Sequence, residues 1–189
     1  LYPEERDPRA FFQALSNLKV AGEISAEKLQ IVLRATGSDA LYQPKLIALN
    51  LQDIVRLEPV IAYRDALREM LRADGLLLFQ GSVCNHQVPA KIYEYFRSAR
   101  PIFALVDPGG ISAVMLGEAG VQDQANIADV QQITEAMSVF LSKLRNGKCG
   151  GVTRDVAMRN SRRSRARELA QVLDELIVAR ELQQLSRQS

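Results

Sequence analysis

One predicted helix carries a cation and a carboxylate near its beginning, where a helix can bind an anion. The helix starts near Pro89, Lys91 lies in its first turn, and Glu94 lies five residues into it. The first backbone N–H groups of a helix have no partner within the helix, and the helix dipole is positive at this end, so both suit a diphosphate. A carboxylate at this position can accept two hydrogen bonds from a ribose diol. These residues therefore predict a site for a nucleoside diphosphate.

Each of these residues also has a plainer interpretation. Glu94 can be a solvated or salt-bridged helix residue, Lys91 an ordinary surface lysine, and His86 in the preceding loop simply exposed. Cys84 and His86 are formal candidates for a nucleophilic Cys–His pair, in which the histidine activates the thiol. A separation of two residues within one loop is weak support for such a pair. The run 108–110, Pro-Gly-Gly, either presents backbone N–H groups to a ligand or makes a tight turn between a strand and a helix.

The elements that position this loop alternate between helical segments and short apolar runs. Helices are predicted at residues 8–22, 39–50, 63–72, 89–99, 110–119 and 129–145, and strands at 29–33, 54–57, 75–79 and 101–106, with a weaker strand at 120–122. Unbroken apolar runs are typical of strands buried on both faces, as in a parallel sheet covered by helices. The alternation therefore predicts an α/β, Rossmann-like doubly wound parallel sheet with ligands at the carboxyl ends of its strands.

Composition narrows the classes of function. The chain has 189 residues, 47% of them apolar, which is enough for one sizeable core. Its formal net charge of +2 disfavours a surface for nucleic acid, so no such partner is expected. Two cysteines without CxxC spacing and one histidine predict no metal site. No apolar run is long enough to cross a bilayer and no signal peptide is recognisable, so a cytoplasmic location is expected.

The segment 81–104 resembles the donor-binding motif of family 4 glycosyltransferases and their GT-B relatives. In that motif two glutamates separated by seven residues precede a small-residue turn, a proline and an apolar strand. Glu94 stands at the second glutamate, residues 89–95 match a common variant of the motif, and residues 100–102 match the strand entry. The resemblance extends over roughly residues 1–146 and implies the nucleotide-sugar-binding, C-terminal half of a GT-B fold.

The resemblance implies a role for each residue of the site. No residue is assigned to catalysis, although His86 is expected to contact the sugar. The remaining implied contacts with the donor are made by Glu94 to the ribose, by the backbone of Val60 and Ile61 to the base, by Arg6 to the diphosphate, and by Lys91 and Ala90 to the diphosphate and sugar.

Two positions depart from the family pattern. His86 stands where the first glutamate of the motif faces the transferred sugar, which leaves a degenerate donor site as an alternative. Ala99 replaces the glycine that precedes Arg100 in the pattern. This second change is expected to matter little, provided that the backbone keeps φ of Ala99 below zero.

The C-terminal part, residues 147–189, is predicted to be a linker followed by a basic amphipathic helix that packs on the domain or on a partner. Four arginines at its start suit phosphate or the anionic inner face of a membrane, or are simply solvated. They are Arg162, Arg163, Arg165 and Arg167. An apolar stripe at helical spacing follows them, formed by Leu169, Val172, Leu173, Leu176 and Ile177.

The activity that the resemblance implies is that of a retaining glycosyltransferase of the hexosyltransferase class, active in polysaccharide biosynthesis. The donor would be a nucleoside-diphosphate sugar, with neither cofactor nor metal required. The acceptor would bind to an N-terminal domain that this chain lacks, so the isolated fragment is expected to be inactive. The alternatives are a degenerate domain of the same family and a non-catalytic α/β interaction module of the receiver or flavodoxin type. The sequence has neither the well-placed acidic pair of a receiver domain nor the Ser/Thr-rich phosphate loop of a flavodoxin.

Overall fold

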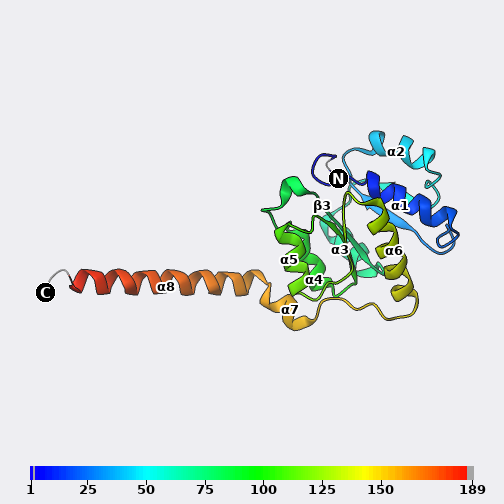
Figure 1. The fold of residues 1–189 in the computed structure, drawn as a ribbon. Coiled ribbons are helices and arrows are strands. Elements are labelled where there is room, and N and C mark those ends of the chain that lie inside the picture. The colour runs from blue at the N-terminus through cyan, green and yellow to red at the C-terminus, as the bar shows by residue number, and fades with distance from the viewer. Residues whose placement is uncertain (2, 187–189) are drawn as a thin grey trace.

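Helices and strands alternate along the chain up to residue 145, after which only helices follow (Figure 1). A computed structural model describes residues 1 and 3–186, with residues 178–186 described by their backbone alone. The elements are α1 (Arg9–Val20), β1 (Ile31–Arg34), α2 (Asp39–Ala48), β2 (Val55–Glu58), α3 (Tyr63–Arg72), β3 (Leu76–Gln80), a short 3-10 helix η1 (Ser82–Cys84), α4 (Lys91–Ser98), β4 (Ile102–Val106), α5 (Ile111–Glu118), β5 (Gln124–Asn126), α6 (Val130–Arg145), α7 (Arg154–Arg159) and α8 (Arg162–Ser186).

The strands form two small parallel sheets. β1 pairs with β2, with Ile31 opposite Val55, while β3, β4 and β5 form the second sheet in that order. The class is therefore α/β with parallel strands, as predicted. The single doubly wound sheet that the sequence predicts is not present as such within the described residues, because no ladder joins β1–β2 to β3–β4–β5.

The three-stranded sheet is covered on both faces. Along β4, Phe103 and Leu105 join the hydrophobic cluster formed with α1 and α6, whereas Ile102, Ala104 and Val106 join the cluster formed with α4, α5 and α7. All five residues of β4 are buried, which explains why this strand is an unbroken apolar run. Aromatic contacts stabilise the first face, where the rings of Phe103 and Phe140 lie 5.3 Å apart and those of Phe11 and Phe79 5.4 Å.

The two-stranded sheet is covered on one face only. Ile31 and Leu33 of β1 join the cluster of α1 and α6, but Val32 and its partner Arg56 in the register are exposed. The helix α3 that follows β2 buries none of its residues fully. The expectation that the apolar run 29–33 is buried on both faces is therefore wrong, because the side chains of Val32 and Arg56 on the second face are exposed.

The last strand lies four residues later than the predicted 120–122. The residues expected to form it, 120–122, instead complete the end of α5: Gly120 adopts φ of +85°, and the backbone N–H of Val121 donates to Leu116 at 2.9 Å. This is the pattern that closes helices through a left-handed glycine. The strand begins only after Asp123, as β5.

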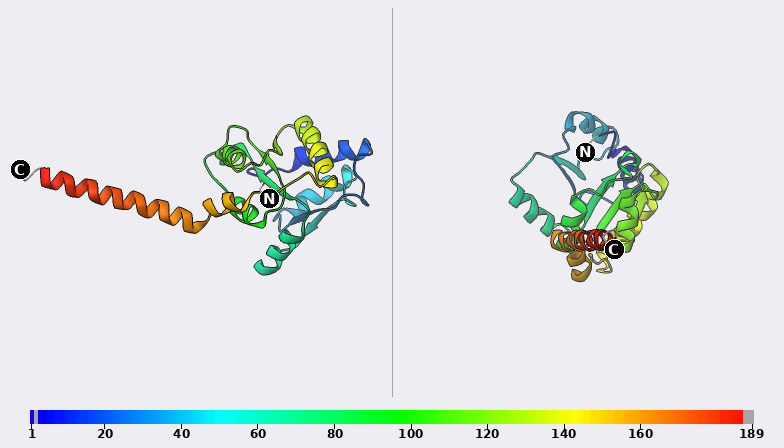
Figure 2. Two further views of the ribbon diagram at one scale, coloured as in Figure 1. Left: turned by 90° about the horizontal axis from the view of Figure 1, so that it is seen from below. Right: turned by 90° about the vertical axis from the view of Figure 1, so that its left-hand side faces the viewer.

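A linker then carries the chain from one face of the three-stranded sheet to the other. Cys149 packs against the cluster of α1 and α6, while Val152 belongs to the cluster of α4, α5 and α7. Beyond α7, the helix α8 runs away from the rest of the molecule (Figures 1 and 2). Among residues 1 and 3–186, no helix has both the length and the apolar character needed to cross a membrane.

Candidate functional site

Glu94 lies beside the loop that connects β2 to α3. It occupies the first turn of α4, and its Oε1 accepts a hydrogen bond of 3.1 Å from the hydroxyl of Tyr63, the first residue of α3. This hydrogen bond, followed by the negative charge of Glu94, raises the pKa of Tyr63. Val60, exposed, and Ile61, half-buried, lie just before α3 in the same loop. The predicted ribose-binding carboxylate and the predicted base-binding loop are therefore neighbours.

Arg6 and Lys91 gather around the N-terminal segment, near the carboxyl ends of β1 and β3. The Nε of Arg6 donates to Oε1 of Gln80, the last residue of β3, at 3.4 Å. The amino group of Leu1 donates to the carbonyl of Thr36, just beyond β1, at 2.6 Å. Its pKa is lowered by burial and then by the positive charges of Lys91 and Arg6. Both predicted diphosphate cations therefore lie at the edge where parallel sheets bind ligands.

The loop between β3 and α4 is anchored through Gln80, which sequence analysis did not identify. This side chain is 3% exposed, and its Nε2 donates to the carbonyls of Cys84 and Gln87 at 3.3 and 3.4 Å. Burial of a polar amide is tolerated because it is hydrogen-bonded on both sides. Within this fixed loop His86 is exposed and Cys84 is buried. The two side chains have opposite environments, so the geometry does not favour the Cys–His nucleophile pair.

Asn85 fastens the same loop to the turn between β4 and α5, a further connection that sequence analysis missed. The side-chain Nδ2 of Asn85 donates to Oδ2 of Asp107 at 3.1 Å, and the backbone carbonyl of Asn85 accepts from the N–H of Ile111 at 2.9 Å. Oδ1 of Asp107 accepts from the N–H of Gly109 at 2.9 Å. That bond, and then the one from Asn85, lowers the pKa of Asp107. The N–H groups of the Pro-Gly-Gly run are used inside the molecule, so the tight-turn interpretation of residues 108–110 holds.

The end of α4 differs from the expectation about Ala99. The backbone φ of Ala99 is +53°, in the left-handed region, where a glycine would be unstrained. The condition under which the Gly-to-Ala departure was expected to matter little is therefore not met. A left-handed residue at the end of a helix is the position where glycine is most common.

Replacing Ala99 by glycine is expected to stabilise the protein by about 0.5–1 kcal/mol, because relief of left-handed strain exceeds the extra entropy of the unfolded chain. The matched control is Ala21→Gly at the end of α1, where φ is −71° and glycine brings only the entropic cost. Urea unfolding followed by circular dichroism measures both. Equal destabilisation by the two substitutions would show that Ala99 is not strained.

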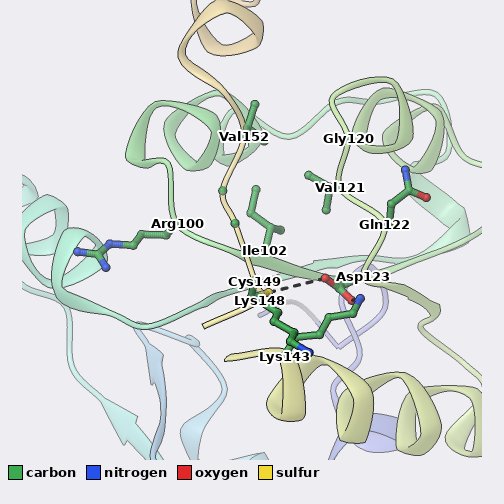
Figure 3. Close-up of a pocket in the computed structure, with 12 residues that line it drawn as sticks. Arg100, Ile102, Gly120, Val121, Gln122, Asp123, Lys143, Lys148, Cys149 and Val152 are labelled. Carbon is green, nitrogen blue, oxygen red and sulfur yellow. Dashed lines mark hydrogen bonds and ion pairs between the residues drawn. The ribbon is translucent and has the colours of Figure 1, made fainter. Parts of the chain in front are cut away.

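Two cavities lie outside this cluster. One, of about 220 Å³, opens near the starts of β4 and β5 and is lined by residues including Ile102, Asp123 and Cys149 (Figure 3). There Lys143 pairs with Asp123 at 2.5 Å, and burial together with the charge of Asp123 raises the pKa of the Cys149 thiol. The other, of about 350 Å³, lies at the ends of β4 and β5, beside Pro108. Neither of these two cavities is lined by Glu94, Lys91 or Arg6.

Comparison of the chain with family models, with curated proteins and with solved structures gave no match. Within the described residues, no group of three His, Cys, Asp or Glu side chains is placed to hold a metal ion.

Proposed function

We propose that this chain binds a nucleoside-diphosphate sugar at the edge formed by the ends of β1, β2 and β3, as the donor-binding domain of a glycosyltransferase. The observation that carries the proposal is the hydrogen bond between Glu94 and Tyr63, because it brings the carboxylate of α4 to the loop after β2. The two cations near the end of β3 supply the complementary charge for a diphosphate.

In this proposal each part of the donor meets a different segment. The ribose hydroxyls replace the Tyr63 hydroxyl as donors to Glu94, and the base lies against the backbone of Val60 and Ile61. The diphosphate lies between Arg6 and the start of α4, where Lys91 and the backbone after Ala90 add positive potential. The exposed His86 faces the sugar. Positive side chains and the helix start would stabilise the departing diphosphate without a metal.

The reaction proposed is transfer of a hexose with retention, in polysaccharide synthesis on the cytoplasmic side of a membrane. The acceptor would be held by a separate domain, as the resemblance to GT-B enzymes implies. An interaction module is the second candidate function, and the exposed apolar stripe of α8 is the observation that favours it.

Calorimetric titration with UDP, GDP and ADP is expected to find saturable binding of one nucleotide, weakened about tenfold by Glu94→Ala. A tenfold loss corresponds to about 1.4 kcal/mol, a typical value for hydrogen bonds to a charged group. The variant should fold normally, because the bond from the exposed Tyr63 is weak and solvent-screened.

Glu118→Ala is the matched control for this titration. Glu118 is an exposed carboxylate at the end of α5, at the opposite edge of the sheet from the ends of β3 and β4. Its removal should leave the affinity unchanged. Equal effects of the two substitutions would mean that Glu94 is misassigned. If none of the three nucleotides binds at about 1 mM, the free energy of binding is weaker than about 4 kcal/mol. This result would contradict the donor-site proposal for this chain.

A further inference from the structure

The larger of the two cavities described above lies at the carboxyl ends of β4 and β5 and has a volume of about 350 Å³. Parallel α/β sheets bind their ligands at this edge. Small-molecule sites range from about 300 to 1,000 Å³, so the cavity suits a ligand smaller than a typical drug. We call it the β4–β5 pocket. The residues that line it are Val106, Pro108, Ala113, Val114, Gln124, Ala125, Asn126 and Gln132.

Three carboxamide side chains in the wall of the pocket are held in place by the fold. Oε1 of Gln132 accepts a hydrogen bond from the backbone N–H of Asn126, and the N–H of Gln132 donates to the capping carboxylate of Asp129 at 3.0 Å. Nε2 of Gln124 donates to the carbonyl of Val121 at 2.7 Å. The carboxamides are therefore positioned before any ligand arrives, which lowers the entropic cost of binding.

Each of these carboxamides keeps a hydrogen-bonding group that no other residue in the described part of the chain uses. Asn126 accepts through Oδ1 from the N–H of Ala128 at 3.0 Å, and Gln132 accepts through Oε1, so the Nδ2 and Nε2 donors are left over. Gln124 makes its hydrogen bonds through Nε2, so its Oε1 acceptor is left over. The pocket therefore offers two donors and one acceptor to a ligand.

The rest of the lining is aliphatic, and the described residues that line the pocket include neither a charged side chain nor an aromatic ring. A charged ligand would lose hydration there without meeting an opposite charge. A nucleobase is usually held by stacking on an aromatic ring, which this wall does not supply. The ring of a neutral sugar, in contrast, presents C–H groups to aliphatic side chains, and each of its hydroxyl groups can both donate and accept.

We propose that the β4–β5 pocket binds an uncharged saccharide unit, whose hydroxyl groups are hydrogen-bonded to the three carboxamides and whose ring lies against the aliphatic wall. The pocket shares no residue with the proposed donor site around Glu94, Lys91 and Arg6. The inference therefore does not rest on the proposed function, and it is tested without a nucleotide.

The test is titration of the isotope-labelled full chain with glucose, mannose, maltose and cellobiose up to about 50 mM, followed by amide NMR spectra. At least one of these sugars is expected to shift the backbone amide signals of Asn126 and Gln132 saturably. The expected Kd is millimolar, because a few hydrogen bonds in an open pocket contribute little net free energy. The amide signal of Glu94 should not move.

Gln132→Leu removes the carboxamide at similar side-chain size and should weaken the binding about tenfold, equivalent to about 1.4 kcal/mol. Gln132 is exposed, so this variant should fold normally. The matched control is Gln131→Leu, since the adjacent Gln131 is also exposed but donates to Glu135 at 3.0 Å and does not line the pocket. This control should leave the affinity unchanged.

Two results would overturn the proposal outright. One is the absence of a saturable shift with all four sugars, and the other is an equal loss of affinity in Gln132→Leu and Gln131→Leu. Glucuronate and uridine test the class of ligand. If either shifts the signals of Asn126 and Gln132 at lower concentration than the neutral sugars, the pocket belongs to a charged or a base-containing ligand and the saccharide assignment is wrong.

Discussion

Replacing Gly151 by alanine is expected to destabilise the protein by about 3 kcal/mol, at the upper end of the usual cost of overpacking. A Cβ on Gly151 would fall inside the contact distance of the carbonyl carbon and oxygen of Ala99, and its third neighbour would be the Cα of Ala99 at 2.8 Å. All three neighbours are backbone atoms, so no side-chain rotation can make room. Ala99 is already left-handed, and moving it would also disturb the entry to β4.

Gly150→Ala is the control for this substitution. The two glycines are adjacent in the same linker, but a Cβ on Gly150 would have no neighbour within 4 Å. Neither residue has a positive φ, so any difference between the variants reports on space alone. Urea unfolding should find Gly150→Ala within about 0.5 kcal/mol of the wild type. A loss below about 1 kcal/mol for Gly151→Ala would contradict the close crossing of the linker over Ala99.

Phe103→Ala is expected to cost about 4 kcal/mol, because it removes a fully buried aromatic side chain from the middle of the sheet. Phe103 is 0% exposed in β4, and its ring lies 5.3 Å from that of Phe140 on α6. The alanine would leave a cavity between the sheet and α6 and remove the aromatic pair. The free energy of unfolding, from urea titration of each variant, measures the loss.

Two comparisons sharpen this second prediction. Phe103→Leu should cost less than Phe103→Ala, since most of the side-chain volume and apolar area remain. Val32→Ala, on the exposed face of β1, should cost under about 1 kcal/mol, since little area is lost there. Similar losses for Phe103→Ala and Val32→Ala would contradict the finding that β4 is covered on both faces while β1 is covered on one.

The order and type of the elements were predictable because they depend on local period. Helical spacing in residues 8–22 and 129–145 corresponds to α1 and α6, and the apolar run 101–106 corresponds to β4. The proximity of Glu94 to the β2–α3 loop also followed from the sequence in outline. Parallel strands with helical crossovers bring the loops after each strand to a common edge, whatever the side chains within the loops.

The partners at that edge were not predictable. Gln80 and Asn85 have no local pattern that marks them, since each acts through carbonyls or carboxylates brought close by the folded chain. The hydroxyl that meets Glu94 comes from Tyr63, 31 residues earlier. Hydrogen bonds over such separations depend on tertiary packing, which propensity and periodicity do not encode.

The sequence by itself determined an α/β chain of parallel strands, a polar loop before a helix that begins with a cation and a carboxylate, and a C-terminal helix. Tertiary structure alone decided that the strands form two sheets, that Ala99 is left-handed, that Gly151 crosses over it, and that α8 leaves the body. The physical reason is how far apart along the chain the contacting residues lie. Local period is set by neighbouring residues, whereas sheet pairing, close backbone approach and exposure depend on segments that meet only in the folded chain.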